Sequence, residues 1–177
     1  LVLIDEAYCD FGAETAATLI DTYENLLVVQ TLSKSRSLAG LRVGFALGQA
    51  PLIEGLNRVK NSFNSYPLDR LAQAGALAAI EDREAMRAAA AKIVATRDRT
   101  IAAMRQMGYR VLDSKTNFIM AEHPQYPGEA LFTYLRENGV LVRHFKQPGI
   151  ENFLRITIGT DEEMDVFLRV LKEYREV

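Results

Sequence analysis

The chain contains 177 residues, of which 49% are hydrophobic and 25% charged, proportions typical of a globular protein with one or two domains. With 21 Lys and Arg against 23 Asp and Glu, the net charge is −2, so the basic excess that non-specific nucleic-acid binding requires is absent. One cysteine, Cys9, and two histidines exclude an internal disulfide and argue against a metal site. The apolar runs are shorter than the ~18 residues of a membrane-spanning helix. We expect a reducing, cytoplasmic compartment.

The first four residues, Leu-Val-Leu-Ile, are apolar on both faces and predict a central, buried strand. Because the sequence begins inside this strand and without Met, we expect a fragment of a longer protein. A trimmed fragment and the product of a naturally short gene both fit this expectation.

A strand–helix–strand unit is predicted next. Apolar residues between 16 and 23 recur at helical spacing, and the run 26–29 is a second buried strand. Strands joined in this way are parallel, so their carboxyl ends lie at one edge of the sheet. Ligands of open α/β sheets bind at that edge.

The middle of the chain is predicted to contain one strand followed by helices. A loop over 35–40 leads to a third strand at 42–47. Three helices are then predicted, one at 51–63, a buried Ala-rich one at 68–80, and a long one at 83–107 that ends at Gly108.

The last part of the chain changes in style to an α+β unit on a mixed or antiparallel sheet. Short strands are predicted at 109–112, 117–121, 140–143 and 153–158, with a helix at 129–138. Thr160 and Glu163 form a capping box that opens a final helix reaching Glu176. We place the domain boundary between Asp82 and Arg83, which gives domains of residues 1–82 and 83–177.

Four side chains with complementary chemistry fall near the predicted sheet edge: Asp5, Tyr8, Lys34 and Arg42. A carboxylate at the end of a buried strand needs a positive partner, and a lysine amine there can act as a nucleophile. An arginine offers a planar fork for a phosphate, and a tyrosine can donate a hydrogen bond. Lysine for a Schiff base, carboxylate for a pyridinium nitrogen and arginine for a phosphate are the groups that bind pyridoxal 5'-phosphate (PLP).

Three segments carry a resemblance to a known family: Asp-Glu-Ala-Tyr at 5–8, Thr-Leu-Ser-Lys at 31–34, and Leu-Ala-Gly-Leu-Arg-Val-Gly-Phe at 38–45. Together they resemble the fold-type I PLP-dependent aminotransferases, class I/II, and within them the histidinol-phosphate aminotransferase group. Segments 68–74 and 153–160 are similar to that group as well. The resemblance covers nearly the whole chain but only the C-terminal half of the family's catalytic fold.

The resemblance implies an α/β fold: the end of a mostly parallel large-domain sheet that binds PLP, followed by an α+β small domain. It also implies roles for five residues. Lys34 would form the Schiff base and move the proton at Cα, and Asp5 would keep the pyridine nitrogen protonated. Tyr8 would bind the ring hydroxyl oxygen, while Ser33 and Arg42 would bind the cofactor phosphate.

Two arginines are implied as substrate ligands. Arg155 would clamp an α-carboxylate or the corresponding end of the amino substrate, and Arg143 would lie near the substrate phosphate. The spacing between them is one residue shorter than the family's usual spacing, which makes Arg143 the less secure of the two.

The implied activity is transamination between histidinol phosphate and 2-oxoglutarate, in histidine biosynthesis, by a cytoplasmic homodimer without a metal. The stacking aromatic ring and the phosphate-binding amides of the family lie in its N-terminal half, so we expect this chain to be inactive alone. An aromatic aminotransferase, a threonine-phosphate decarboxylase and a truncated, non-catalytic remnant are the alternatives.

Overall fold

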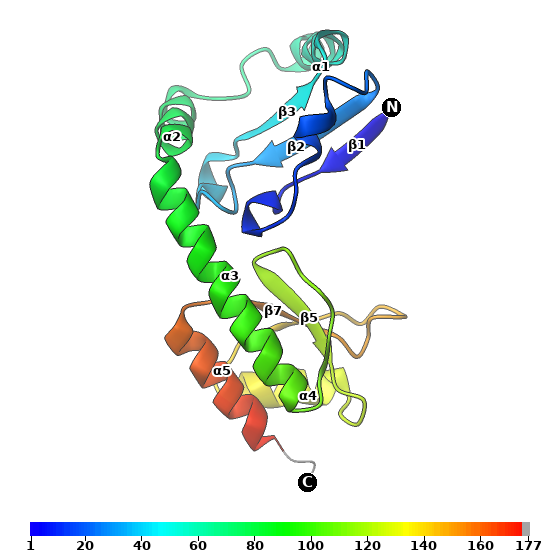
Figure 1. The fold of residues 1–177 in the computed structure, drawn as a ribbon, viewed down its shortest axis with the longest axis vertical. Coiled ribbons are helices and arrows are strands. Elements are labelled where there is room, and N and C mark those ends of the chain that lie inside the picture. Colours follow the sequence, from blue (N-terminus) through cyan, green and yellow to red (C-terminus); the bar gives the residue numbers. More distant parts are fainter. Residues whose placement is uncertain (175–177) are drawn as a thin grey trace. The chain divides into compact units, whose positions relative to one another are not determined.

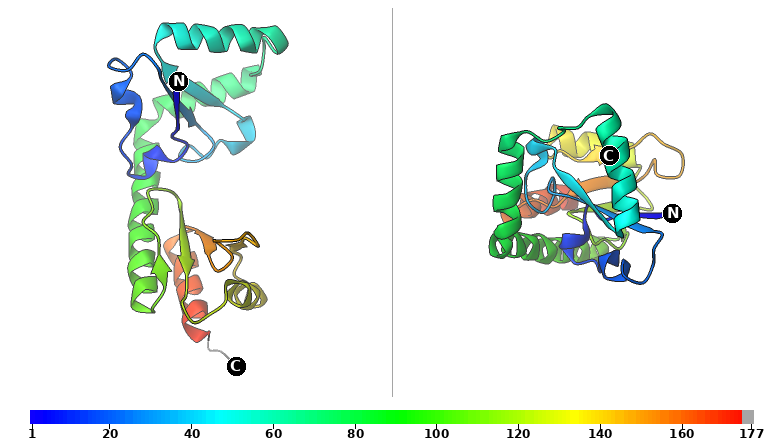
Figure 2. Two further views of the ribbon diagram at one scale, coloured as in Figure 1. Left: turned by 90° about the vertical axis from the view of Figure 1, so that its right-hand side faces the viewer. Right: turned by 90° about the horizontal axis from the view of Figure 1, so that it is seen from above.

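The computed structural model describes residues 1–174, and the chain forms two compact units, Leu1–Ala90 and Ala91–Val177. The division lies within the long helix α3, Arg83–Gln106, which is continuous through it (Figure 2). The sequence-based boundary at residue 82 lies just before this helix, and its assignment of domains stays a prediction. None of the helices described is long and apolar enough to cross a membrane.

The first unit contains a three-stranded sheet in the order β1-β2-β3. Strand β1, Val2–Asp5, pairs in parallel with β2, Leu26–Thr31, as predicted. Strand β3, Gly44–Gly48, is antiparallel to β2, and the arrows in Figure 1 show the reversal. The strand begins two residues later than expected because Arg42 has a left-handed backbone with φ 55°, which extended strands do not contain.

One prediction about this unit is wrong in part. The connection between β1 and β2 holds two short 3-10 helices, Cys9–Phe11 and Ala16–Leu19, in place of one regular helix. The first strand is exposed in this chain, with 57% of the Leu3 surface accessible, because within residues 1–174 β1 pairs on one side only. The unpaired edge and the exposed apolar side chains are what we expect of an interior strand in a fragment of a longer protein.

Helices α1, Ala50–Phe63, and α2, Arg70–Glu81, follow the sheet. The Asp69 carboxylate caps α2 by accepting a hydrogen bond from the Ala72 amide at 2.7 Å. The prediction of a buried helix here is wrong, because Leu71 is 80% exposed. Only the small side chains of Ala72 and Ala76 are buried in α2, against Leu32 and Val43.

The second unit is an antiparallel sheet in the order β4-β5-β7-β6, covered by helices, as predicted for an α+β unit. Its elements after α3 are β4, Arg110–Val111; β5, Phe118–Glu122; α4, Gly128–Glu137; β6, Arg143–His144; β7, Leu154–Thr157; and α5, Asp161–Glu173. Ile119 and Ile156 are paired across β5 and β7 and belong to a core completed by Met104 of α3, Leu135 of α4 and Phe167 of α5. Arg155 lies between Leu154 and Ile156 on β7 and is therefore on the opposite face of the sheet.

The predicted helix ends of this unit are confirmed. Gly108 and Gly139 follow α3 and α4 with φ of 89° and 78°, in the left-handed region that glycine adopts without strain. Thr160 and Glu163 form the reciprocal capping box at the start of α5. The predicted end of this helix at Glu176 lies outside the described residues.

Candidate active site

The parallel strands β1 and β2 bring Asp5 and Lys34 to one edge of the first sheet. Asp5 ends β1 and lies opposite Val29 of β2, which continues to Thr31 and then turns into the Lys34 segment (Figure 1). The Lys34 amine nitrogen lies 5.5 Å from the centroid of the Tyr8 ring, within the range of a cation–π contact. The structure thus brings together the lysine and the tyrosine that the sequence predicts for the site.

The polar atoms of this edge retain capacity for a ligand. Within residues 1–174, the Lys34 amine makes no hydrogen bond or ion pair. Asp5 is exposed and uses Oδ1 to accept a hydrogen bond from the Ala7 amide at 3.0 Å, so Oδ2 remains available. A nucleophilic amine and a carboxylate at one sheet edge are the groups that PLP chemistry requires of the protein.

Ser33 and Arg42 lie on adjacent segments of the same edge. The Ser33 hydroxyl accepts a hydrogen bond from the Thr31 hydroxyl at 2.9 Å, and the Leu32 amide donates to the Val43 carbonyl at 3.1 Å. Arg42 is exposed, and one of its nitrogens, Nη1, donates to the Ala39 carbonyl at 3.0 Å. The other guanidinium nitrogens remain available, as a phosphate-binding arginine requires.

Glu6 supports the edge from inside the unit and is a residue that the sequence reasoning missed. Glu6 is 8% exposed. Its carboxylate accepts hydrogen bonds from the Thr15 hydroxyl at 2.7 Å, the Ala16 backbone amide at 2.5 Å and the Gln30 side-chain amide at 2.9 Å. Burial raises the pKa of this carboxyl, but the hydrogen bonds outweigh it and the net pKa is lowered. Strand alternation was the available signal. Asp5 and Glu6 are consecutive at a strand end, and alternation directs one of two consecutive side chains inward.

Cys9 follows Tyr8 but is not a candidate nucleophile. Burial, followed by the negative charges of Asp10 and Glu6, raises the pKa of its thiol to about 11, and the thiolate is the reactive form. Among the described residues there is also no group of three or more potential metal ligands from His, Cys, Asp and Glu.

The second unit brings Arg143 and Arg155 together. They are directly opposite each other in the antiparallel pair of β6 and β7, where two like charges destabilise a sheet unless an anion lies between or over them. Neither arginine forms a salt bridge within residues 1–174. This pair is therefore suited to bind an anionic ligand.

Arg155 is held in a way that leaves its polar atoms unused. Its guanidinium carbon lies 4.0 Å from the centroid of the Phe118 ring, and its Nε atom is buried without a hydrogen-bond partner. Leaving a buried donor unpaired costs ~1–3 kcal/mol, which a bound carboxylate or phosphate would offset. Phe118, as the platform for Arg155, was not predicted from the sequence.

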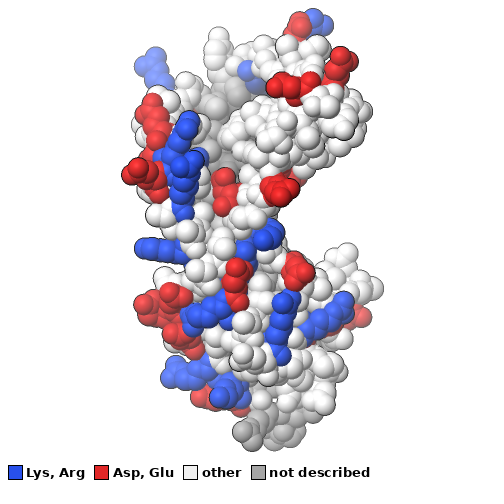
Figure 3. Space-filling model, viewed as in Figure 1, with Lys and Arg blue, Asp and Glu red and all other residues white. Residues whose placement is uncertain are grey.

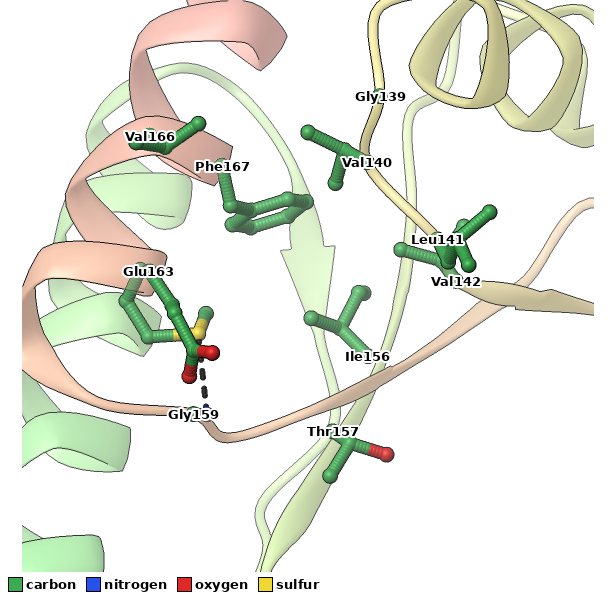
Figure 4. A pocket seen from close by; sticks show the side chains of 11 residues that line it. Gly139, Val140, Leu141, Val142, Ile156, Thr157, Gly159, Glu163, Val166 and Phe167 are labelled. Carbon is green, nitrogen blue, oxygen red and sulfur yellow. Dashed lines mark hydrogen bonds between the residues drawn. The ribbon is translucent and has the colours of Figure 1, made fainter.

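A hollow of ≈ 470 Å³ lies in the second unit and is lined in part by Val142 and Ile156, the sequence neighbours of these arginines. Figure 4 shows Val140, Ile156 and Phe167 facing into it. Neither arginine is among the residues that line the hollow. Its apolar lining lacks the convergent charges of the arginine pair, so we assign it no part in the site.

Charged residues of both signs are interspersed over the face drawn in Figure 3. This mixture agrees with the net charge of −2, and that face carries no continuous basic stripe of the kind that binds a nucleic-acid backbone.

Comparison with known proteins gives the family. The model of the family "Aminotransferase class I and II" matches residues 1–171. Histidinol-phosphate aminotransferase 2 of Thiobacillus denitrificans is 58% identical over 97% of the chain, and histidinol-phosphate aminotransferase of Clostridium acetobutylicum is 57% identical over 98%. The chain covers only 48% and 49% of these two relatives.

A solved structure agrees with this result. Histidinol-phosphate aminotransferase of Sinorhizobium meliloti, in complex with pyridoxal-5'-phosphate, superimposes with a TM-score of 0.83 at 26% identity, over 98% of this chain and 48% of that one. The predicted fold class is thereby confirmed. The chain belongs to the class I and II aminotransferases, and it represents the C-terminal half of the family's fold.

Proposed function

We propose that this chain is the C-terminal half of a PLP-dependent aminotransferase that exchanges the amino group between histidinol phosphate and 2-oxoglutarate in the cytoplasm. The relatives named histidinol-phosphate aminotransferase, at 57% and 58% identity, support this substrate class. The domain assignment that goes with it is residues 1–82 for the end of the cofactor domain and 83–177 for the small domain.

The observation that carries the proposal is the Lys34 amine, which lies over the Tyr8 ring at 5.5 Å with no ionic partner in the described residues. Lysines on protein surfaces rarely need an explanation, but this one shares a sheet edge with a carboxylate whose Oδ2 atom is available. When bound, PLP supplies an electron sink that makes the Cα proton of an amino substrate acidic.

Each of the site residues in the first unit would then have a separate role toward the cofactor or the substrate. The Lys34 amine would hold the cofactor as its covalent partner and would move the proton at Cα of the substrate. Asp5 holds the proton on the ring nitrogen, and the Tyr8 hydroxyl donates a hydrogen bond to the ring oxygen. The Ser33 hydroxyl and the Arg42 guanidinium hold the phosphate.

The arginine pair of the second unit would hold the substrate. Arg155, with its unpaired Nε atom, would take the α-carboxylate of the oxo acid, or the corresponding end of the amino substrate. Arg143, opposite it, would take the phosphate of histidinol phosphate. Two positive forks side by side fit substrates that carry anionic groups better than neutral amines.

The test uses a restored enzyme, in which the N-terminal half of the Thiobacillus denitrificans relative is joined in front of this chain. The enzyme is loaded with PLP and reduced with borohydride, and its peptides are mapped. The pyridoxyl group is expected on Lys34, and a Lys34→Ala variant serves as the control. A label that falls on Lys60 or another lysine would refute the assignment.

We also propose that the 177-residue chain does not transaminate alone. It contains only half of the fold of its relatives, and β1 has an unpaired edge with exposed apolar side chains, which favours association with another chain. Catalytic groups must be held within ~0.5 Å of their working positions, and half a site does not achieve this. Two measurements test this proposal: glutamate formation from histidinol phosphate and 2-oxoglutarate, and molecular mass by light scattering. Turnover by a clean monomer would contradict both the expected inactivity and the expected association.

The full-length protein is proposed to be a homodimer. Dimerisation is typical of the family, and its expected partner is a second copy. Sedimentation of the restored enzyme tests the proposal, because a monomer at micromolar concentration with full activity would refute it.

A further inference from the structure

The segment Leu32–Leu38, called here the Lys34 loop, is held by contacts that the roles assigned above do not use. Its backbone closes on itself: the Ser37 amide donates to the Lys34 carbonyl and the Leu38 amide to the Leu32 carbonyl, both at 3.1 Å. These bonds shape the loop, but they do not fix its position against the rest of the unit.

A hydrogen bond between Asp10 and Ser35 joins the loop to the opposite part of the site. Ser35 directly follows Lys34, is 9% exposed, and donates its hydroxyl proton to Asp10 Oδ2. Asp10 lies in the 3-10 helix that begins one residue after Tyr8. The bond thus links Ser35, the neighbour of Lys34, with Asp10. Asp10 comes two residues after Tyr8, whose ring the Lys34 amine contacts.

A second anchor lies on the other side of the loop. Arg36 donates through Nη1 to the Ala79 carbonyl, which belongs to the last turn of α2, where carbonyl groups lack partners within the helix and favour a positive charge. Lys34 is therefore followed by two residues that are each hydrogen-bonded to a different element.

Packing alone does not hold the loop. A hollow of ≈ 240 Å³ lies beside it, lined by Ser35, Arg36 and Ser37 on the loop side and by Ala79 and Met86 among the helix residues. Leu32 and Leu38 are packed at the two ends of the loop, but its central residues border this space and can shift without a steric clash. The position of this central part therefore depends on its hydrogen bonds.

We infer that Asp10 and Ser35 are positioning residues, which hold the Lys34 loop so that the amine lies over the Tyr8 ring. The inference rests on the proposed role of Lys34 for its consequence in catalysis, but not for its structural part. Arg36 provides the second anchor. None of these three side chains needs to touch cofactor or substrate.

Hydrogen exchange in the 177-residue chain tests the structural part without any cofactor. Ser35→Ala and Asp10→Ala are expected to speed the exchange of the Ser37 and Leu38 amides by about tenfold, because loss of a hydrogen bond to a charged group lets the loop open. Ser35→Thr, which keeps the hydroxyl and has the adjacent hollow for its methyl group, is expected to restore protection. Exchange in Ser35→Ala within about twofold of the unmodified chain would overturn the inference.

The matched control is Ser37→Ala, which removes an exposed hydroxyl from the same loop that makes no hydrogen bond in the described residues. Faster exchange at Leu38 in this variant, equal to that in Ser35→Ala, would show that any loss of a hydroxyl loosens the loop and would also overturn the inference.

The catalytic part is tested in the restored enzyme, reading kcat and KM separately. Misplacing the amine affects the proton transfer more than substrate binding, so Ser35→Ala is expected to lower kcat about tenfold with KM little changed, and Ser35→Thr to recover it. An unchanged kcat would refute the positioning role. If the unmodified restored enzyme is not labelled at Lys34, the proposed function fails instead, while the exchange rates still decide whether Asp10 and Ser35 hold the loop.

Discussion

Glu6 offers a test of how the first unit supports its site, because its carboxylate connects three separate segments. It accepts hydrogen bonds from Thr15 and Ala16, in the connection after β1, and from Gln30 on β2. Glu6 also lies between Asp5 and Tyr8 in the sequence, so the position of both depends on it. We consider its replacement by glutamine, which keeps the size and removes the charge.

The expected cost follows from the contacts. Glutamine offers one acceptor oxygen where Glu6 has two, so at least one of the three donors loses its partner, and the remaining bonds lose the assistance of the charge. A hydrogen bond to a charged group contributes ~1.5–3 kcal/mol and an unpaired buried donor costs ~1–3 kcal/mol. Glu6→Gln should therefore lower the free energy of unfolding by ~2–4 kcal/mol at neutral pH.

The pH dependence has a definite sign. The folded-state pKa of Glu6 is lowered from its ordinary 4.5, so the carboxylate binds its proton less readily in the folded chain than in the unfolded one. Its contribution to stability is complete above about pH 4.5 and is lost as the pH falls through the lowered folded-state pKa. The difference between the unmodified chain and Glu6→Gln should narrow over that interval.

Urea unfolding followed by circular dichroism measures both effects, at pH 7 and at several values below 4.5. Glu14→Gln is the matched control, because Glu14 is exposed in the same connection and forms no hydrogen bond among the described residues. The reasoning is refuted if Glu6→Gln costs no more than Glu14→Gln, or if its cost is the same at low pH as at neutral pH.

Three further predictions concern the site and its supports. In the restored enzyme, Asp5→Asn should slow deprotonation of the substrate while PLP stays bound, whereas Arg42→Ala should chiefly weaken PLP retention, by ~1.5–3 kcal/mol; equal effects of both on retention, measured by dialysis and absorbance, would contradict the roles. Arg155→Ala should impair 2-oxoglutarate most, and Arg143→Ala should lower the preference for phosphorylated over unphosphorylated amines; steady-state kinetics with both amines would show an unchanged preference if Arg143 has no such role. Thr160→Ala should lower the stability of the second unit by ~1 kcal/mol through loss of the helix cap, and a urea midpoint identical to that of the unmodified chain would refute it.

Local patterns predicted the elements whose stabilising groups are neighbours in the sequence. The capping box of α5 needs only residues three apart, and Gly139 ends α4 through its own backbone. The parallel pairing of β1 and β2 followed from the rule for connected strands. The common edge of Asp5 and Lys34 was thus accessible from the sequence.

The contacts that support the site depend on residues far apart in the chain. The bond from Ser35 to Asp10 spans 25 residues, and the bond from Gln30 to Glu6 spans 24. Burial also failed where it depends on neighbours: α2 has the composition of a buried helix, but Leu71 is exposed because the packed face of α2 consists of alanines. Composition indicates that a face can be buried, and only the fold determines whether it is.

The pairing of Arg143 with Arg155 is explained by function and not by stability. A sheet selected only for stability would not place Arg143 opposite Arg155, because like charges across a strand pair repel and neither has an acidic partner in the described residues. The cost is reduced by packing Arg155 over Phe118 and Arg143 over Phe145, at 4.0 and 5.4 Å from the ring centroids. Aromatic contacts hold the two guanidinium groups while leaving their hydrogen-bond donors unused, whereas carboxylate partners would have consumed those donors. An arrangement that is unfavourable in the empty chain and favourable with an anion bound is what a substrate-binding site requires, and it is why the pair supports the proposed function more strongly than either arginine would alone.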